Sequence, residues 1–455
     1  MRIYKAFSVP GFFLNPLKTR KPYEPAWMAF LLFVSFASLA RAEAVTLKDC
    51  LSEAMAHNPA IEEGQLGVMA GDEEIAGAKG KHLPKISLNA DYTHRQDPLP
   101  FIPAKSTTIP AHFSDEFASW QAVLSVPLYQ GGRIQNGVRL AKIRQVVKEN
   151  TLALTRNEII ANTVNTFNKL LQMEKLSQAS NASVKALSQQ RNNVALLYQL
   201  GRLPRIDLLK VEVQLANEKQ RLSTIDEGLS ASRETLAFLL GRSLNSAQSD
   251  LEPEGEPAFS HIVCSFDPGW ASARKRRPEY RIALKGVEEA KLMARSSLGA
   301  LLPAVSALGG YLDQTGFEPR HSEENWFGGL NLTIPLFERS LYADLRRDRI
   351  LAKKAEIHLK AVENRIRLEL RNAVDSVARA RERVENSKAA VDQARESFRI
   401  EGEKYASGAG TMVDLLLAQA ADFTASANHT QSIFDYNAAV VEYRRAAGLL
   451  EEYLK

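Results

Sequence analysis

The chain has 455 residues and a formal net charge of +5 at pH 7, but the positive excess lies in its first 42 residues. That segment holds six basic residues and one acid, so the rest of the chain has 52 residues of each sign and no net charge. A neutral chain lacks the basic surface that nucleic-acid binding requires, and its composition argues against a nucleic-acid partner.

Residues 1–42 have the pattern of a secretory signal peptide. Three basic residues precede an apolar run from Ala26 to Leu39, and Ala40-Arg41-Ala42 has small residues at the positions that a signal peptidase recognises. The apolar run is about 14 residues long, whereas a membrane-spanning helix needs about 20. We therefore expect this segment to direct export and to be removed.

The reactive side chains of the exported part give no indication of catalysis. Cys50 and Cys264 are its two cysteines, and in an oxidising compartment they could form a disulfide or remain free thiols. The eight histidines show no metal-ligand spacing, and neither a nucleophile motif nor a phosphate-binding loop is found. We expect no cofactor, no metal and no enzymatic activity.

The sequence after the signal contains one unit twice. Its length of roughly 200 residues is too great for a solenoid repeat and indicates two halves of one pseudo-symmetric body. We assign repeats to residues 43–243 and 267–455, with a linker at 244–266. The recurring segments are Leu83–Ser87 and Leu302–Ser306, Leu124–Tyr129 and Leu332–Phe337, and Tyr198–Leu209 and Tyr405–Leu416.

Each repeat contains two segments in which apolar and polar residues alternate, the pattern of β-strands. In the first segment, Ile86, Leu88 and Tyr92 fall on one face, and Ser87 and Asn89 fall on the other. All four segments are about 10 to 12 residues long and have aromatic residues near their ends, as tilted membrane-spanning strands do. The predicted strands cover residues 85–96 and 116–129, then 304–315 and 325–337.

Four strands cannot form a closed barrel in a membrane. The smallest membrane barrels have about eight strands, and lipid does not tolerate an open sheet edge. If these strands lie in a membrane, the chain must therefore oligomerise; a small water-soluble sheet is the alternative. Residues 97–115 and 316–324 connect the strands and are predicted to be exposed loops.

Long helices without internal proline follow each pair of strands. At about 1.5 Å per residue, the longer helix of each repeat would extend about 100 Å, so the repeats must pack side by side as helical hairpins. The predicted helices cover residues 133–200, 205–240, 341–407 and 412–454. The turns between them are Gly201, Arg202, Leu203 and Pro204 in the first repeat, and Gly408, Ala409, Gly410 and Thr411 in the second.

Four motifs in a fixed order resemble one known family. They are Ala56-His57-Asn58-Pro59, Leu83-Pro84, Ser125-Val126-Pro127-Leu128 followed by Gly131-Gly132, and Tyr-x-x-Gly-x-x-x-x-x-Asp-Leu-Leu, which occurs at both hairpin turns. Over nearly all of residues 45–452 the chain is similar to the TolC-like outer membrane efflux proteins. The resemblance implies a mainly α fold with a membrane β-barrel part, in which a homotrimer forms a 12-stranded β-barrel and a 12-helix periplasmic α-barrel.

The same resemblance implies a passive channel-tunnel in the outer membrane. Its partners would be two further copies of the chain, a periplasmic adaptor, an inner-membrane transporter and outer membrane lipid. Small molecules are the expected cargo of such a tripartite exit duct. The alternatives are a type I secretion duct for a polypeptide and a coiled-coil envelope spacer without a channel; the sequence names neither the cargo nor the partner pump.

The hairpin turns are the candidate site. In the family these turns meet the adaptor, and the glycines also suit the left-handed end of a helix. Asp207 and Asp414 are predicted either as acids of a helix start or as an acidic ring at the periplasmic mouth. Tyr198 and Tyr405 are candidates for holding the mouth closed or for simple packing, and Leu417 stands where some family members have a second acid.

Overall fold

The computed structural model describes residues 43–102, 112–242, 251–255, 259, 261–317 and 320–454. The signal peptide predicted at 1–42 lies outside these residues, as do parts of the predicted loop 97–115 and linker 244–266. The described part of the linker includes β4 (Leu251–Pro253), which pairs in parallel with β1 (Glu43–Val45).

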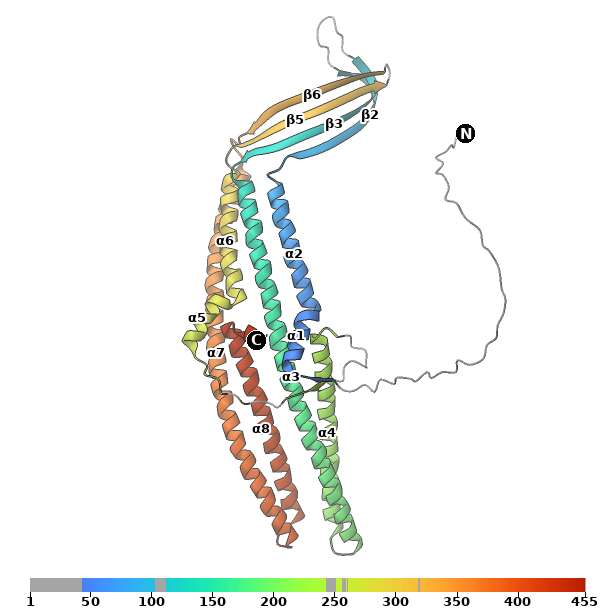
Figure 1. Ribbon diagram of the computed structural model, residues 1–455, viewed down its shortest axis with the longest axis vertical. Coiled ribbons are helices and arrows are strands. Elements are labelled where there is room, and N and C mark those ends of the chain that lie inside the picture. The colour runs from blue at the N-terminus through green and yellow to red at the C-terminus, as the bar shows by residue number, and fades with distance from the viewer. Residues whose placement is uncertain are drawn as a thin grey trace, which may run out of the picture. The chain divides into compact units, whose positions relative to one another are not determined.

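Two consecutive helices precede the strands of each repeat (Figure 1). They are α1 (Leu47–His57), α2 (Pro59–Gly80), α5 (Phe266–Arg276) and α6 (Pro278–Gly299). A proline begins the second helix of each pair, because its missing N–H is not needed in the first turn and its φ already suits a helix. Asn58 and Arg277 occupy the same place at the two breaks, 219 positions apart.

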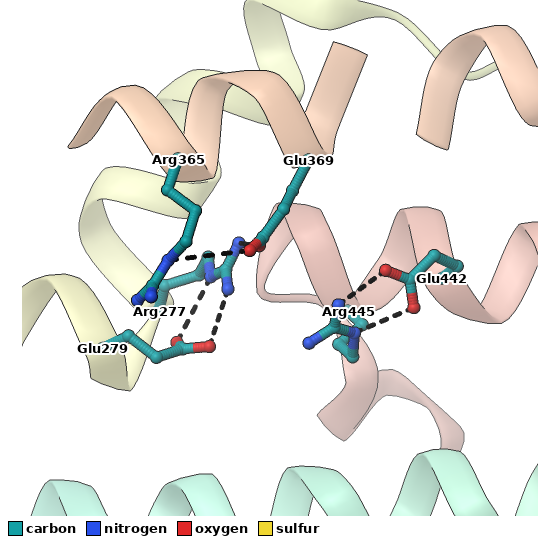
Figure 2. A network of polar contacts seen from close by, with 6 residues as sticks. All are labelled: Arg277, Glu279, Arg365, Glu369, Glu442 and Arg445. Carbon is teal, nitrogen blue, oxygen red and sulfur yellow. Dashed lines mark hydrogen bonds and ion pairs between the residues drawn. The ribbon is translucent and has the colours of Figure 1, made fainter. Parts of the chain in front are cut away.

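The two breaks are stabilised differently. Asn58 is buried, donates to the carbonyl oxygen of Leu239 (2.8 Å) and accepts from the amide of Ala60 (3.0 Å). Arg277 is also buried, at 2% exposure, but donates to two carboxylates, those of Glu279 and Glu369 (Figure 2). The same local break in the chain is thus held by an amide in one repeat and by an ionic network in the other.

The long helices form two hairpins. They are α3 (Arg133–Gln199) with α4 (Arg205–Leu239), and α7 (Arg339–Ala406) with α8 (Met412–Ala447). The helix predicted over 412–454 is interrupted after Ala447, because Gly448 adopts a left-handed φ of 72°. A short 3₁₀ helix, Leu450–Leu454, follows it.

Four antiparallel strands form one sheet in the order β2-β3-β5-β6. They are β2 (Lys85–Ile102), β3 (His112–Gln130), β5 (Ala304–Phe317) and β6 (Arg320–Thr333). The register pairs Leu88 with Ala122, Ala122 with Tyr311, and Tyr311 with Trp326, so the apolar positions of all four strands share one face. Within the described chain, the outer edges of β2 and β6 pair with no other strand.

The strands do not begin and end where the alternation predicted. β2 and β3 extend into the segment predicted as a loop, and β2 contains Pro98 and Pro100 where its pairing with β3 shifts register. An edge strand tolerates proline because one side of it needs no ladder partner. The strand predicted at 325–337 lies at 320–333 instead, because β5 begins at Ala304 opposite Thr333 and offers no partner to later residues.

Helices α2, α3, α6 and α7 lie side by side in that order and continue from the four strands (Figure 1). The backbone of the β3–α3 turn closely approaches the backbone at the end of α6: a Cβ on Gly131 would lie 2.0 Å from the carbonyl oxygen of Gly299. Gly131 also has a φ of 61°, so both the close backbone approach and the left-handed conformation require glycine at this position.

Each repeat has its own apolar core. Phe167, Leu170 and Leu236 belong to the first, and Leu370 and Tyr436 belong to the second. Cys50 lies in the first core and Cys264 packs against the second, and both are free thiols, so no disulfide joins them. Burial raises the pKa of Cys50 to about 12, and burial also raises the pKa of Cys264.

Candidate functional site at the hairpin turns

Both hairpin turns end their first helix in the same way. Gly201 and Gly408 have φ values of 69° and 75°, and each donates to the carbonyl oxygen of the tyrosine three residues before it. The next residue, Arg202 or Ala409, donates to the carbonyl oxygen five residues back at 2.9 Å. This double hydrogen bond is the Schellman arrangement, and it requires a left-handed residue at the glycine position.

The second helix of each hairpin begins differently. Thr411 is the N-cap of α8: its hydroxyl accepts from the amide of Asp414 at 3.2 Å and donates to the Asp414 carboxylate at 2.6 Å. Pro204 takes that place before α4 and has no side chain that could cap. Asp207 therefore has no capping partner; its carboxylate lies 3.8 Å from the ammonium of Lys210.

Side chains from both hairpins form a small apolar cluster just above the turns. Val194, Val211 and Met412 are its buried members. The partly buried side chains around them are Leu203, Leu208, Tyr405 and Leu416. Gln190 adds a polar contact by donating to the sulfur of Met412 at 3.2 Å. The structure thus joins the two hairpins through residues that lie about 200 positions apart in the chain.

The charge of Asp207 acts on Tyr405 across the hairpins. Burial raises the pKa of the Tyr405 hydroxyl, and the negative charge of Asp207 raises it further. Their counterparts in the other repeat differ. Tyr198 is 40% exposed, and Asp414 is engaged with Thr411 at its own helix start. The duplicated motif therefore gives one electrostatic interaction between hairpins and one local cap.

Apolar side chains near both turns are exposed, including that of the predicted residue Leu417. Leu417 is 65% exposed, and Leu200 and Leu209 are also exposed. Around Gly201 and Gly408 no atom lies within 4 Å of where a Cβ would stand. Both turns therefore have open space around their first glycine and exposed apolar side chains nearby.

A second contact between the hairpins lies farther from the turns, and the sequence did not indicate it. The Arg221 guanidinium of α4 stacks over the ring of Phe423 in α8, 4.6 Å from its centroid. Glu218 holds Arg221 at 3.1 Å and accepts from the hydroxyl of Ser180 at 2.8 Å. Because Arg221 and Phe423 lie on different repeats, no local pattern could have paired them.

Neither a metal site nor a membrane-spanning helix is found in the described part of the chain. No group of three or more histidine, cysteine or acidic side chains lies close enough there to hold a metal ion. Each described helix is too short or too polar to cross a membrane.

The fold is that of an outer membrane channel. The chain superimposes on the Campylobacter jejuni CmeC outer membrane channel with a TM-score of 0.77, over 88% of this chain and 85% of that one, at 16% identity. A sequence model of the outer membrane efflux protein family matches residues 50–242 and 270–449. The chain belongs to this family, as its motifs predicted, and the family places it in the outer membrane as an efflux protein.

Two curated relatives are similar in sequence. The outer membrane efflux protein BepC of Brucella suis biovar 1 (strain 1330) is 20% identical over 377 residues, which cover 82% of this chain and 79% of the relative. Nodulation protein T of Rhizobium leguminosarum bv. trifolii is 25% identical over 230 residues. That match covers 49% of this chain and 48% of the relative, so the chain spans about half of its length.

Proposed function

We propose that three copies of this chain form one passive duct through the outer membrane and the periplasm. The observation that carries the proposal is the sheet: its four strands share an apolar face, and the outer edges of β2 and β6 are unpaired in the described chain. Lipid does not tolerate such edges, so the edges must meet those of other copies. Three sheets supply twelve strands, and twelve is within the range of membrane barrels.

The helices support the same arrangement. Helices α2 and α7 lie at the two ends of the row α2-α3-α6-α7, below the two edge strands. Each exposes large apolar side chains: Leu66 and Met69 on α2, and Ile350 and Ile357 on α7. Contact between α2 of one copy and α7 of the next would cover these side chains and continue the closure of the barrel into a helical tunnel.

The hairpin turns are the proposed docking and gating end. An inner-membrane transporter would supply the driving force, and a periplasmic adaptor would contact the open turns around Gly201 and Gly408. The apolar cluster of Met412 holds the two hairpins together, and separation of the hairpins would widen the mouth. The chain itself contributes no catalytic step.

Small molecules are the proposed cargo. A polypeptide carried by a type I secretion system is the other candidate, because the same duct geometry would serve it. Export assays in cells that lack the chain distinguish the two: loss of resistance to small toxic compounds supports the first, and loss of one secreted protein with unchanged resistance supports the second.

The oligomer is tested with the full-length protein extracted in detergent. We expect a trimer by mass measurement and ion conductance in planar bilayers. Leu66→Glu together with Met69→Glu should weaken the trimer, because two carboxylates would be buried between copies. The matched control is Leu196→Glu, an exposed leucine on α3 away from α2. Equal trimer stability in both variants would refute the proposed contact.

A further inference from the structure

A groove of about 700 Å³ lies between α2 and α3, where the helices leave the sheet. Its apolar wall includes Ala78, Ile134 and Leu140, and Lys81 and Arg133 lie among its lining residues. The volume is within the range of small-molecule sites, about 300 to 1,000 Å³. We refer to it as the neck groove.

The neck groove opens on the polar side of the sheet. Pro127 and Gln130 line it, and the strand register places Pro127 opposite Ser306. Successive residues of a strand point to opposite faces, so Pro127 shares its face with Ser125 and not with the apolar Leu124. A register shift between Pro127 and Tyr129 places Gln130 opposite Ala304 and therefore on the same face as Pro127. In the proposed duct the apolar face contacts lipid, and the polar side is therefore the lumen.

Two positive charges in the neck groove are not compensated. Four charged residues line it, and two of them are in ion pairs: Glu74 is 2.8 Å from Lys148, and Arg144 is 2.9 Å from Glu289. Lys81 has no ion pair within the described chain. Among the residues that the structure describes, the Arg133 guanidinium donates only to the neutral Gln130, through the carbonyl oxygen and the side-chain oxygen of Gln130.

Two helix-interior glycines keep the neck groove open. Gly77 of α2 and Gly137 of α3 line it, and a Cβ on either would meet no atom within 4 Å. Glycine destabilises a helix interior relative to alanine, and packing within this chain gives no reason for it here. A second hollow of about 350 Å³, lined by α3, α6 and α7, shares Gly137 and Leu140 with the neck groove, so the open space continues along this face.

We propose that the neck groove binds amphipathic organic anions as they pass through the duct. The apolar wall accepts the hydrocarbon part, and Lys81 and Arg133 attract the anionic group. The proposal names a cargo class for the proposed duct and depends on that function for the position of the lumen. Soluble anions are favoured over lipid because the groove lies on the side away from the apolar strand face.

The test is equilibrium dialysis of naphthalene-1-sulfonate against the full-length protein in nanodiscs of zwitterionic phosphatidylcholine. We expect saturable binding that weakens with salt, and no comparable binding of naphthalen-1-ylmethylammonium. Lys81→Glu combined with Arg133→Glu should lower the affinity about tenfold or more, from the loss of two charge contacts and the gain of two repulsive ones. Gly137→Leu should fill the groove and abolish binding.

Gly67→Leu and Gly286→Leu are the matched controls. Both glycines lie inside helices with open space at the Cβ position, but neither lines the neck groove. Both should bind the anion as the wild type does. Unchanged affinity in the Lys81/Arg133 double variant, or equal binding of the cation, would overturn the proposal. So would loss of the trimer in Gly137→Leu alone, because the groove would then be occupied by another copy.

Conductance separates this proposal from the proposed function. If the wild-type protein conducts ions but does not bind the anion, the proposed anion site is refuted and the proposed duct is not. If the wild-type protein binds the anion but does not conduct ions, the proposed duct is refuted, and with it the position of the groove in a lumen.

Discussion

The most informative single substitution is Arg277→Met, at the break between α5 and α6. The Arg277 side chain is 3% exposed, and its guanidinium lies 2.6 Å from both the Glu279 and the Glu369 carboxylates. Methionine has a similar length but no charge. The substitution therefore keeps the volume of the site and leaves two carboxylates without their main partner (Figure 2).

The expected cost follows from the exposure of those carboxylates. Removing one partner of a buried ion pair destabilises a protein by about 3–5 kcal/mol. Glu279 and Glu369 retain 18% and 27% exposure, and Arg365 lies 3.8 Å from Glu369 and partly compensates it. We therefore expect the free energy of unfolding to fall by about 3 kcal/mol, the lower end of that range. The measurement is unfolding in guanidinium chloride followed by far-UV circular dichroism.

The first repeat supplies the control. Asn58 and Ala60 occupy the positions of Arg277 and Glu279, so Arg277→Asn with Glu279→Ala copies the arrangement of the first repeat into the second. This double variant removes one of the two carboxylates along with the arginine. Its free energy of unfolding should fall by less than that of Arg277→Met. A larger loss would show that the network does not act through unpaired charge.

The pH dependence gives an independent check. Burial would raise the pKa of Glu279, but its hydrogen bonds and the charge of Arg277 outweigh burial and lower it below the ordinary 4.5. A carboxylate with a lowered pKa in the folded state stabilises the protein above its unfolded pKa, and the contribution is lost as pH falls. The difference between wild type and Arg277→Met should shrink below about pH 4.5. A difference under about 1 kcal/mol at pH 7, or one independent of pH, would refute the reasoning.

Three further predictions concern other parts of the chain. Gly131→Ala should destabilise the protein strongly, because the new Cβ would lie 2.0 Å from a backbone oxygen. Gly132→Ala, also at positive φ but in open space, should lower the free energy of unfolding by only about 1 kcal/mol. Equal melting temperatures of the two variants would contradict this. Thr411→Ala should cost about 1 kcal/mol and speed amide exchange at the start of α8, and unchanged exchange at Asp414 would count against the cap. Cys50, with a pKa of about 12, should resist maleimide at pH 7 until the protein unfolds, and rapid labelling of native protein would show that the core opens.

The repeated sequence pattern predicted the elements better than their ends. Alternation placed Leu88, Ala122 and Trp326 on one face because a strand has a fixed period of two, and the register agrees. It misplaced the strand at 325–337, because the end of a strand depends on where its partner begins. Polar positions beyond the apolar stretch, such as Glu323, still pair when a neighbouring strand reaches them.

The candidate site shows the same limit. The motif of Tyr198 and Tyr405 marked both turns, since glycine at positive φ is a local requirement. The cap formed by Thr411 and Asp414 is local, and the threonine three residues before the aspartate indicates it. The motif could not reveal that the charge of Asp207 acts on Tyr405, because that depends on packing between repeats. Met412 and the Arg221–Phe423 stack were missed for the same reason.

The central claim is that the unpaired edges of β2 and β6 meet between copies. It is tested most directly by cysteine crosslinking of Ala90 on β2 to Leu330 on β6 in a chain whose two native cysteines are replaced by serine. A short bifunctional maleimide scanned along the two edges should give covalent dimers and trimers from membranes. Crosslinks that form only within single chains, together with a monomeric mass in detergent, would contradict the account.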